Sequence, residues 1–242
     1  MADERTRRRY LLSLLAAVSA VVVWAAIAPV DRPTWMLENA LFVVGVAILV
    51  ATYRPLPLSR VSYTLIAIFM CLHEVGAHYQ YANVPYDAWG QSLFGFSIDA
   101  LCGFQRNMYD RCVHFSYGLL LAYPMREVVL RIADVKGFWG YFLPLDVTMS
   151  TSMLYELIEW GASNVFGEGT GMAYLGTQGD AWDSHKDMLL ASLGALVSML
   201  VTALINWRLQ RDFGREWANS LRVHHPRPLG EEALARMGRK KR

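Results

Sequence analysis

Charged residues are scarce in this sequence. Asp, Glu, Lys and Arg make up only 18% of its 242 residues, whereas hydrophobic residues make up 54%. Soluble domains of ordinary composition carry about 25% charged residues. The shortage of charge excludes a soluble globular enzyme and a nucleic-acid-binding protein, and the apolar excess is expected to face lipid.

Cysteine is also rare. The three cysteines, Cys71, Cys102 and Cys112, show no CxxC spacing and are too few to form a disulfide framework. Free thiols are the simplest expectation for all three. Cys102 and Cys112 fall in or beside the same predicted external segment, so one bridge between them stays open as an alternative.

The apolar residues are gathered in runs of about 20 residues, the length that crosses a hydrocarbon core of about 30 Å as a helix. The sequence therefore predicts an all-α fold, a polytopic membrane helical bundle of about six transmembrane helices. The expected spans are residues 10–30, 35–53, 61–78, 110–129, 138–160 and 185–207. The first run resembles a signal peptide but is too long for one, so we expect an uncleaved helix.

Basic residues near the ends of the spans define an orientation. They gather at the N-terminus, in the segments 54–60 and 126–136, and from Arg208 onward, all on one side of the predicted bundle. Lys and Arg are retained on the cytoplasmic side, so both termini are expected in the cytoplasm. Residues 1–207 then form a single membrane domain with an external loop at 79–109, and residues 208–242 form a basic cytoplasmic tail.

Ionisable residues within or beside the spans cluster at the predicted external surface. A charged side chain inside a span costs about 2.5 to 3.5 kcal/mol on insertion scales, so such residues are candidates for a functional site. Four spans contribute to this layer. The residues are His73, Glu74 and His78; Asp110 and His114; Glu156 and Glu159; and Asp180, Asp183, His185, Lys186 and Asp187.

Imidazole and carboxylate side chains at one level of a bundle are typical ligands of zinc, iron or manganese. In a divalent-metal hypothesis the ligands come from His73, His78, His114, Glu156, Asp183 and His185. Glu74, Glu159 or Asp187 then supplies a catalytic base, and Asp110, Asp180 and Lys186 complete the polar layer. The residues leave two alternatives open, a hydrogen-bonded network that holds the bundle together and pairs simply wetted by headgroup water.

Several of these segments carry a resemblance to a known family. Residues 72–79 (LHEVGAHY), 84–89 (VPYDAW), 137–146 (GFWGYFLPLD) and 176–183 (GTQGDAWD) resemble the YjdF-type inner-membrane proteins of bacteria. The resemblance implies a multi-pass protein of the bacterial inner membrane and supplies no reaction, because the function of that family is unknown.

A second resemblance is to the VanZ-like membrane proteins. Their pattern is similar to Asp110 with His114, then Glu156 or Glu159, then Asp183 with Asp187. This likeness implies action on envelope lipids or lipid-linked sugars. The sequence departs from that pattern by adding the cluster at residues 73–78 and by its long external loop.

Three functions are compatible with these patterns. The first is an enzyme that hydrolyses or transfers a group on a lipid-linked or envelope substrate, using a bound metal or paired acid and base residues. The second is a cation- or proton-coupled transporter, although the cytoplasmic halves of the spans offer no matching polar path. The third is a structural or partner-binding protein. The lipid bilayer is the partner that all three share.

Overall fold

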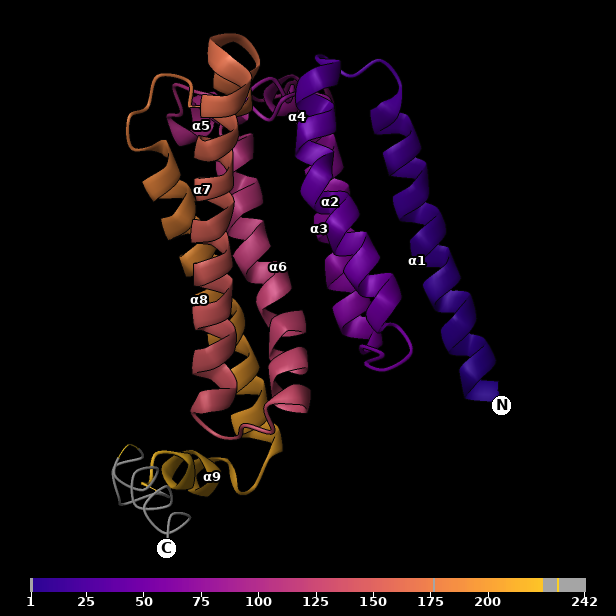
Figure 1. The fold of residues 1–242 in the computed structure, drawn as a ribbon, viewed down its shortest axis with the longest axis vertical. Coiled ribbons are helices and arrows are strands. Elements are labelled where there is room, and N and C mark those ends of the chain that lie inside the picture. Colours follow the sequence, from indigo (N-terminus) through magenta and orange to yellow (C-terminus); the bar gives the residue numbers. More distant parts are fainter. Residues whose placement is uncertain (1, 176, 224–229, 231–242) are drawn as a thin grey trace, which may run out of the picture.

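The computed structural model describes residues 2–175, 177–223 and 230, and for residues 2, 3 and 167–175 it describes the backbone alone. The described residues form nine helices and no strand (Figure 1). The helices are α1 (Ala2–Ala26), α2 (Arg32–Thr52), α3 (Arg60–His78), α4 (Tyr86–Phe94), α5 (Ile98–Cys102), α6 (Tyr109–Ile132), α7 (Trp139–Leu175), α8 (Asp183–Leu209) and α9 (Phe213–Ser220). The predicted all-α fold is confirmed.

Four helical segments in the described part of the chain are long and apolar enough to cross a membrane. They are Glu4–Ala26, Arg32–Thr52, Arg60–His78 and Asp183–Leu209. Helices α6 and α7, with 24 and 37 residues, are long enough but are not among the four. Both contain charged residues, including Asp110 and Glu156, which lower their mean hydropathy. The six predicted spans thus correspond to six long helices, and four of these are apolar enough in composition to cross a membrane.

Several helix boundaries follow from local signals. Asp31 precedes α2 and its carboxylate accepts a hydrogen bond from the Thr34 backbone N–H at 2.9 Å, with Pro33 in the first turn. Ser59 caps α3 by accepting from the Ser62 N–H at 3.2 Å. Helix α7 continues to Leu175, well beyond the predicted end at residue 160.

Helices α6, α7 and α8 form one packed group, in which α6 and α8 approach very closely. A Cβ atom added to Gly118 of α6 would collide with the Ala191 carbonyl, and one added to Gly194 of α8 would collide with the Phe115 carbonyl. Ala191 is fully buried at this contact. Small residues let helix backbones approach in this way within membranes, so α6 and α8 are held in a fixed register.

Helices α1, α2 and α3 form a second group, and α3 joins it to α6. The Glu127 carboxylate of α6 accepts hydrogen bonds from the Ser59 N–H at 2.8 Å and from the Ser62 hydroxyl at 2.6 Å. Toward the other end, the Tyr109 hydroxyl donates to the Leu72 carbonyl at 2.9 Å. The two groups are therefore linked through α3 and α6 near both ends of the bundle.

The predicted external loop and tail both contain helical structure. Residues 79–109 include α4 and α5, whose C-caps Gly95 and Gly103 have φ values of 78° and 70°. Helix α9, inside the predicted tail, packs beneath α7, where the Ser220 hydroxyl accepts from the Phe138 N–H at 2.9 Å. The rest of the tail, at 224–229 and 231–242, lies outside the described residues. All three cysteines are free, so no bridge joins Cys102 and Cys112.

Candidate functional site

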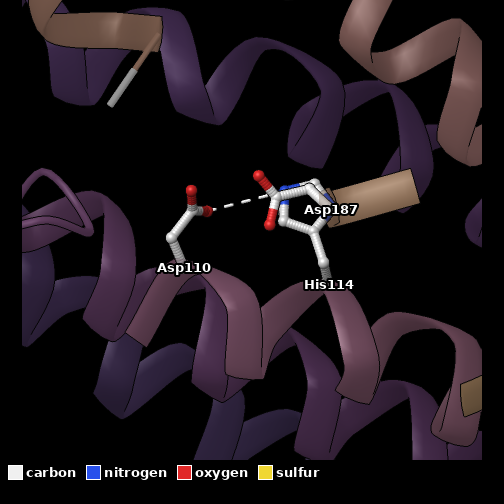
Figure 2. Close-up of side chains that lie close together, drawn as sticks. All are labelled: Asp110, His114 and Asp187. Atoms are coloured by element: carbon white, nitrogen blue, oxygen red, sulfur yellow. Dashed lines mark ion pairs between the residues drawn. The ribbon is translucent and has the colours of Figure 1, made fainter. Parts of the chain in front are cut away.

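Three ionisable side chains from α6 and α8 meet near the end of the bundle that carries α4 and α5. Asp110 and His114 lie one helical turn apart on α6, and Asp187 reaches them from α8 (Figure 2). One oxygen or nitrogen atom of each residue lies within 4.8 Å of the others. We call Asp110, His114 and Asp187, together with Glu156 described next, the acidic–histidine cluster.

Glu156 of α7 completes this cluster from a third helix. The His114 Nε2 atom lies 3.5 Å from Asp110 Oδ1 and 3.6 Å from Glu156 Oε1. Glu156 and Asp187 are 5% and 2% exposed, and Glu156 Oε1 and Asp187 Oδ1 have no hydrogen-bond partner among the described residues. Buried polar atoms are rarely left unpaired, so these two oxygens indicate a ligand or a proton-transfer role.

A layer of ion pairs lies at the starts of α6 and α8, beside the cluster. Arg106 Nη1 lies 2.6 Å from Asp183 Oδ1, and Arg111 Nη2 lies 2.6 Å from Asp180 Oδ2 and 2.9 Å from Asp183 Oδ1. The Lys186 ammonium lies 2.6 Å from Asp180 Oδ2. Hydrogen bonds from Lys186, from the Trp182 N–H and from Arg111 hold the pKa of Asp180 well below its usual range. These pairs tie the start of α6 to the start of α8.

Two further buried carboxylates lie on α2 and α7. Glu38 of α2 and Glu159 of α7 are 4% and 8% exposed. The Tyr155 hydroxyl donates a hydrogen bond to Glu38 Oε2 at 3.2 Å, which joins α2 to α7. A carboxylate in a span is costly unless it is paired or protonated, so these two side chains add to the polar chemistry of this end of the bundle.

An apolar groove of about 490 Å³ runs between α2, α3, α6 and α7. Near the end of the bundle where α1 begins it is lined by residues such as Leu58 and Val128, and farther along by Leu41, Phe42, Ile66 and Phe69. Its other end is lined by His73, Tyr81, Asp110, His114 and Tyr155. The groove therefore leads along the apolar interior to two members of the acidic–histidine cluster. Its volume is in the range of ligand-binding pockets.

The structure brings only part of the predicted polar layer together. Asp110, His114, Glu156 and Asp187 form the cluster, and Asp180, Asp183 and Lys186 form the ion-pair layer above it. Glu159 is buried on α7, three residues beyond Glu156, and is not among the residues grouped with Asp110, His114 and Asp187. His73 lines the groove, with its Nδ1 atom 2.6 Å from the Tyr81 hydroxyl.

Two predicted histidine ligands do not reach the cluster. His78 lies about 140° around its helix from His73, stacks on Trp24 at 4.6 Å and places Nδ1 3.0 Å from the Ala25 carbonyl. His185 is exposed beside Trp182, because two residues on a helix rotate it about 200° away from Asp187. Neither histidine lies with Asp110, His114 and Asp187 in this structure.

Glu74 also lies apart from the cluster. Its side chain is fully buried, and both carboxylate oxygens lack a hydrogen-bond partner among the described residues. It does not line the groove. The expectation that Glu74 shares one site with His114 therefore gains no support from its position.

Sequence reasoning missed several residues of this region. Arg106 and Arg111 are the cations of the ion-pair layer, and Glu38 is a buried carboxylate within the second predicted span. Glu38 had a signal, since any charged residue inside an apolar run is costly. For the two arginines the signal was weaker, because basic residues near span ends mainly report orientation.

An all-helical bundle with four apolar helices of membrane-spanning length defines the class of this protein, an integral membrane protein. Within that class, the chain belongs to the family described as "Predicted membrane protein (DUF2238)", whose model matches residues 10–208. It is 36% identical over 212 residues to the "Inner membrane protein YjdF" of Escherichia coli (strain K12), covering 87% of this chain and 97% of that protein.

These comparisons confirm the predicted YjdF-type resemblance and the location in the bacterial inner membrane. They add no support for the resemblance to VanZ-like proteins. No solved structure gave a significant match, so the arrangement of the site comes from this chain alone.

Proposed function

We propose that the chain crosses the membrane six times, with both termini in the cytoplasm. Helices α6 and α7 run alongside α2, α3 and α8 over much of the same height (Figure 1). Their lower hydropathy has a local cause, because Asp110 and His114 are largely enclosed and Glu156 is buried. The basic segments 54–60 and 126–136 lie at the end of the bundle where α1 begins, as the positive-inside rule requires for the cytoplasmic side.

We further propose that this protein is an enzyme that acts on the headgroup of a lipid-linked substrate at the external surface of the membrane. The observation that carries this proposal is the apolar groove that ends on Asp110 and His114. A hydrocarbon chain in the groove would replace lipid contacts with protein contacts and would place the attached headgroup beside the acidic–histidine cluster. Apolar sites with a few convergent polar groups are the usual form of a ligand site.

The cluster has the groups that acid–base chemistry needs. His114 lies between Asp110 and Glu156, so carboxylates orient its ring. In hydrolysis or transfer, a buried carboxylate accepts the proton of the attacking water or hydroxyl and returns it to the leaving group. Glu156, with an unpaired buried oxygen 3.6 Å from His114 Nε2, is the candidate for that role.

The form of the groove favours a lipid over a transported ion. Its cytoplasmic part is lined by Leu58, Leu121 and Val128, and these side chains offer no ligand to a cation. A charged ion there would lose its hydration without compensation. A hydrocarbon chain loses nothing on entering the same space.

The groove is tested by analysing the lipids that copurify with the protein. Gly45 lines the groove, and a Cβ atom added to it meets no atom within 4 Å, so Gly45→Phe should fill the space. Gly161 of α7 is equally open and does not line the groove, so Gly161→Phe is the matched control. We expect mass spectrometry to detect a specifically enriched lipid on the wild type and on Gly161→Phe.

For Gly45→Phe we expect about tenfold less of that lipid, which corresponds to a loss of about 1.4 kcal/mol in binding. Equal lipid content in the two phenylalanine variants would show that the groove holds no lipid. Catalysis is tested by incubating reconstituted protein with inner-membrane lipid extract and measuring released headgroups. Wild type should release them and His114→Asn should not, whereas no release by the wild type would reduce the protein to a lipid-binding role.

A further inference from the structure

We propose that Asp110, His114 and Asp187 bind one divalent transition-metal ion of the zinc, manganese or iron(II) type, with Glu156 beside the site. The inference deepens the proposed function and rests on it only for the role of the ion in catalysis. It replaces the ligand set predicted from the sequence. His114 remains and Asp110 and Asp187 join it. The predicted ligands left out are His73, His78, Glu156, Asp183 and His185.

The distances around His114 support a metal site rather than a hydrogen-bonded one. Its Nε2 atom lies 3.5 Å from Asp110 Oδ1 and 3.6 Å from Glu156 Oε1. Both separations are longer than the about 2.7 to 3.2 Å of a normal N–H···O hydrogen bond. Ligand atoms about 2.0 to 2.2 Å from a tetrahedral ion lie about 3.3 to 3.6 Å from each other. The separation of His114 from Asp110 matches an edge of such a tetrahedron, and the Asp187 oxygen lies within 4.8 Å of both ligand atoms.

Unpaired buried oxygens provide a second and independent observation. Asp187 Oδ1 and Glu156 Oε1 have no hydrogen-bond partner in the described part of the chain, and their side chains are 2% and 5% exposed. Asp187 offers an oxygen to the same point as Asp110 and His114 (Figure 2). A cation at that point satisfies the unpaired Asp187 oxygen and offsets the like charges of the neighbouring carboxylates.

The ligand types select the class of metal. Magnesium and calcium prefer sites made only of oxygen ligands, whereas zinc, iron and manganese accept imidazole together with carboxylates. The position of the site also fits a catalytic ion. Asp110 and His114 line the groove, and Asp187 and Glu156 do not. The groove side therefore stays available for a substrate oxygen or water, as in catalytic zinc sites.

The test measures metal bound to the full-length protein purified in detergent. The protein is stripped with a chelator, reloaded with Zn²⁺, Mn²⁺ or Fe²⁺ alone, dialysed and examined by elemental analysis. We expect about one ion per chain for at least one of these metals. His114→Asn and Asp187→Asn should each lower the bound metal at least about tenfold, since loss of a ligand exceeds the effect of an outer-shell change.

Two matched variants serve as controls. The first is His185→Asn, since His185 lies on the same helix as Asp187 but is exposed beside Trp182. The second is His78→Asn, since His78 lies against Ala25. Both should keep the full metal content. Because His114→Asn also removes packing, Asp187→Asn, which keeps the side-chain shape, is the decisive variant, and size-exclusion profiles show that each variant is folded.

The outcomes separate this inference from the proposed function. Failure of the wild type to bind any of the three metals, or retention of metal by both His114→Asn and Asp187→Asn, overturns the metal site. Lower thermal stability of these variants without any metal in the wild type also overturns it and identifies a structural network. Copurified lipid is measured separately, so a metal-binding protein with an empty groove overturns the proposed function alone.

Discussion

The two sides of α6 differ in how tightly they pack. On one side α6 meets α8 so closely that neither Gly118 nor Gly194 has room for a Cβ atom. On the other side, toward α2, the groove leaves Gly45 with no atom within 4 Å of an added Cβ. The close side holds Asp110, His114 and Asp187 in register, and the open side leaves space beside them. Close packing and open space therefore lie on opposite faces of one helix.

The largest effect is expected from substitutions that place a side chain on the tightly packed side. Gly118→Val should force α6 and α8 apart, because the added Cβ meets the backbone of Ala191 and not a flexible side chain. Overpacking costs about 1 to 3 kcal/mol or more, and we expect the upper end of that range. Thermal unfolding in detergent measures the loss.

Gly45→Val is the matched control, because the same side chain enters open space on α2. Its free energy of unfolding should change by less than about 1 kcal/mol. Replacing a helical glycine stabilises the helix, and this gain partly offsets the cost of restricting the valine rotamer. Comparable destabilisation of Gly45→Val and Gly118→Val would contradict the contrast between the two sides of α6.

The next effect is expected at the junction between the two helix groups. The Glu127 carboxylate accepts hydrogen bonds from the Ser59 N–H and the Ser62 hydroxyl, and Ser62 is fully buried. Hydrogen bonds to charged groups contribute about 1.5 to 3 kcal/mol, so Glu127→Ala should lower the free energy of unfolding by about that amount. Asp212→Ala, which breaks an exposed pair with Arg215, should change little. Equal stability of the two variants would show that the junction does not hold α3 to α6.

A smaller effect is expected where α2 touches α7. Tyr155→Phe removes the hydroxyl that donates to Glu38 and keeps the ring that lines the groove. We expect a loss of about 1 kcal/mol and faster hydrogen exchange in α2 than in α8, because α2 has few other polar links to the bundle. Tyr53→Phe, at an exposed position, is the control. Unchanged exchange in α2 would indicate that packing alone holds this helix.

The smallest expected effect is the loss of thermal stability at acidic pH. The pKa of Asp180 is held well below its usual range by Lys186, the Trp182 N–H and Arg111. A depressed carboxyl pKa adds stability above the usual value near 3.9, and this contribution is lost as the pH falls through the lower folded value. Between pH 5 and about 3, the thermal midpoint of the wild type should therefore approach that of Asp180→Asn. If the difference between the thermal midpoints of the wild type and Asp180→Asn stayed constant over this interval, the Asp180 charge would have no role in stability.

Some parts of the site were predictable because they depend on sequence spacing. Asp110 and His114 share a face of any helix that contains both, and Asp183 and Asp187 do the same. Their placement near one end of the bundle was predictable from the lengths of the apolar runs. His78 and His185 lie apart from Asp110, His114 and Asp187, because spacing defines a face of a helix and not the neighbour that the face meets.

The sequence alone determined an all-helical membrane protein with its basic residues at one end and its ionisable layer at the other. These features depend on the free-energy cost of placing charged groups and unpaired backbone groups in hydrocarbon. That cost applies to each segment independently of the others. Only the tertiary structure decided which ionisable residues meet. That choice depends on the rotation of each helix about its axis, which the close approach of Gly118 and Gly194 settles for α6 and α8. The groove is likewise a property of contacts between helices far apart in the chain, and no single segment encodes it.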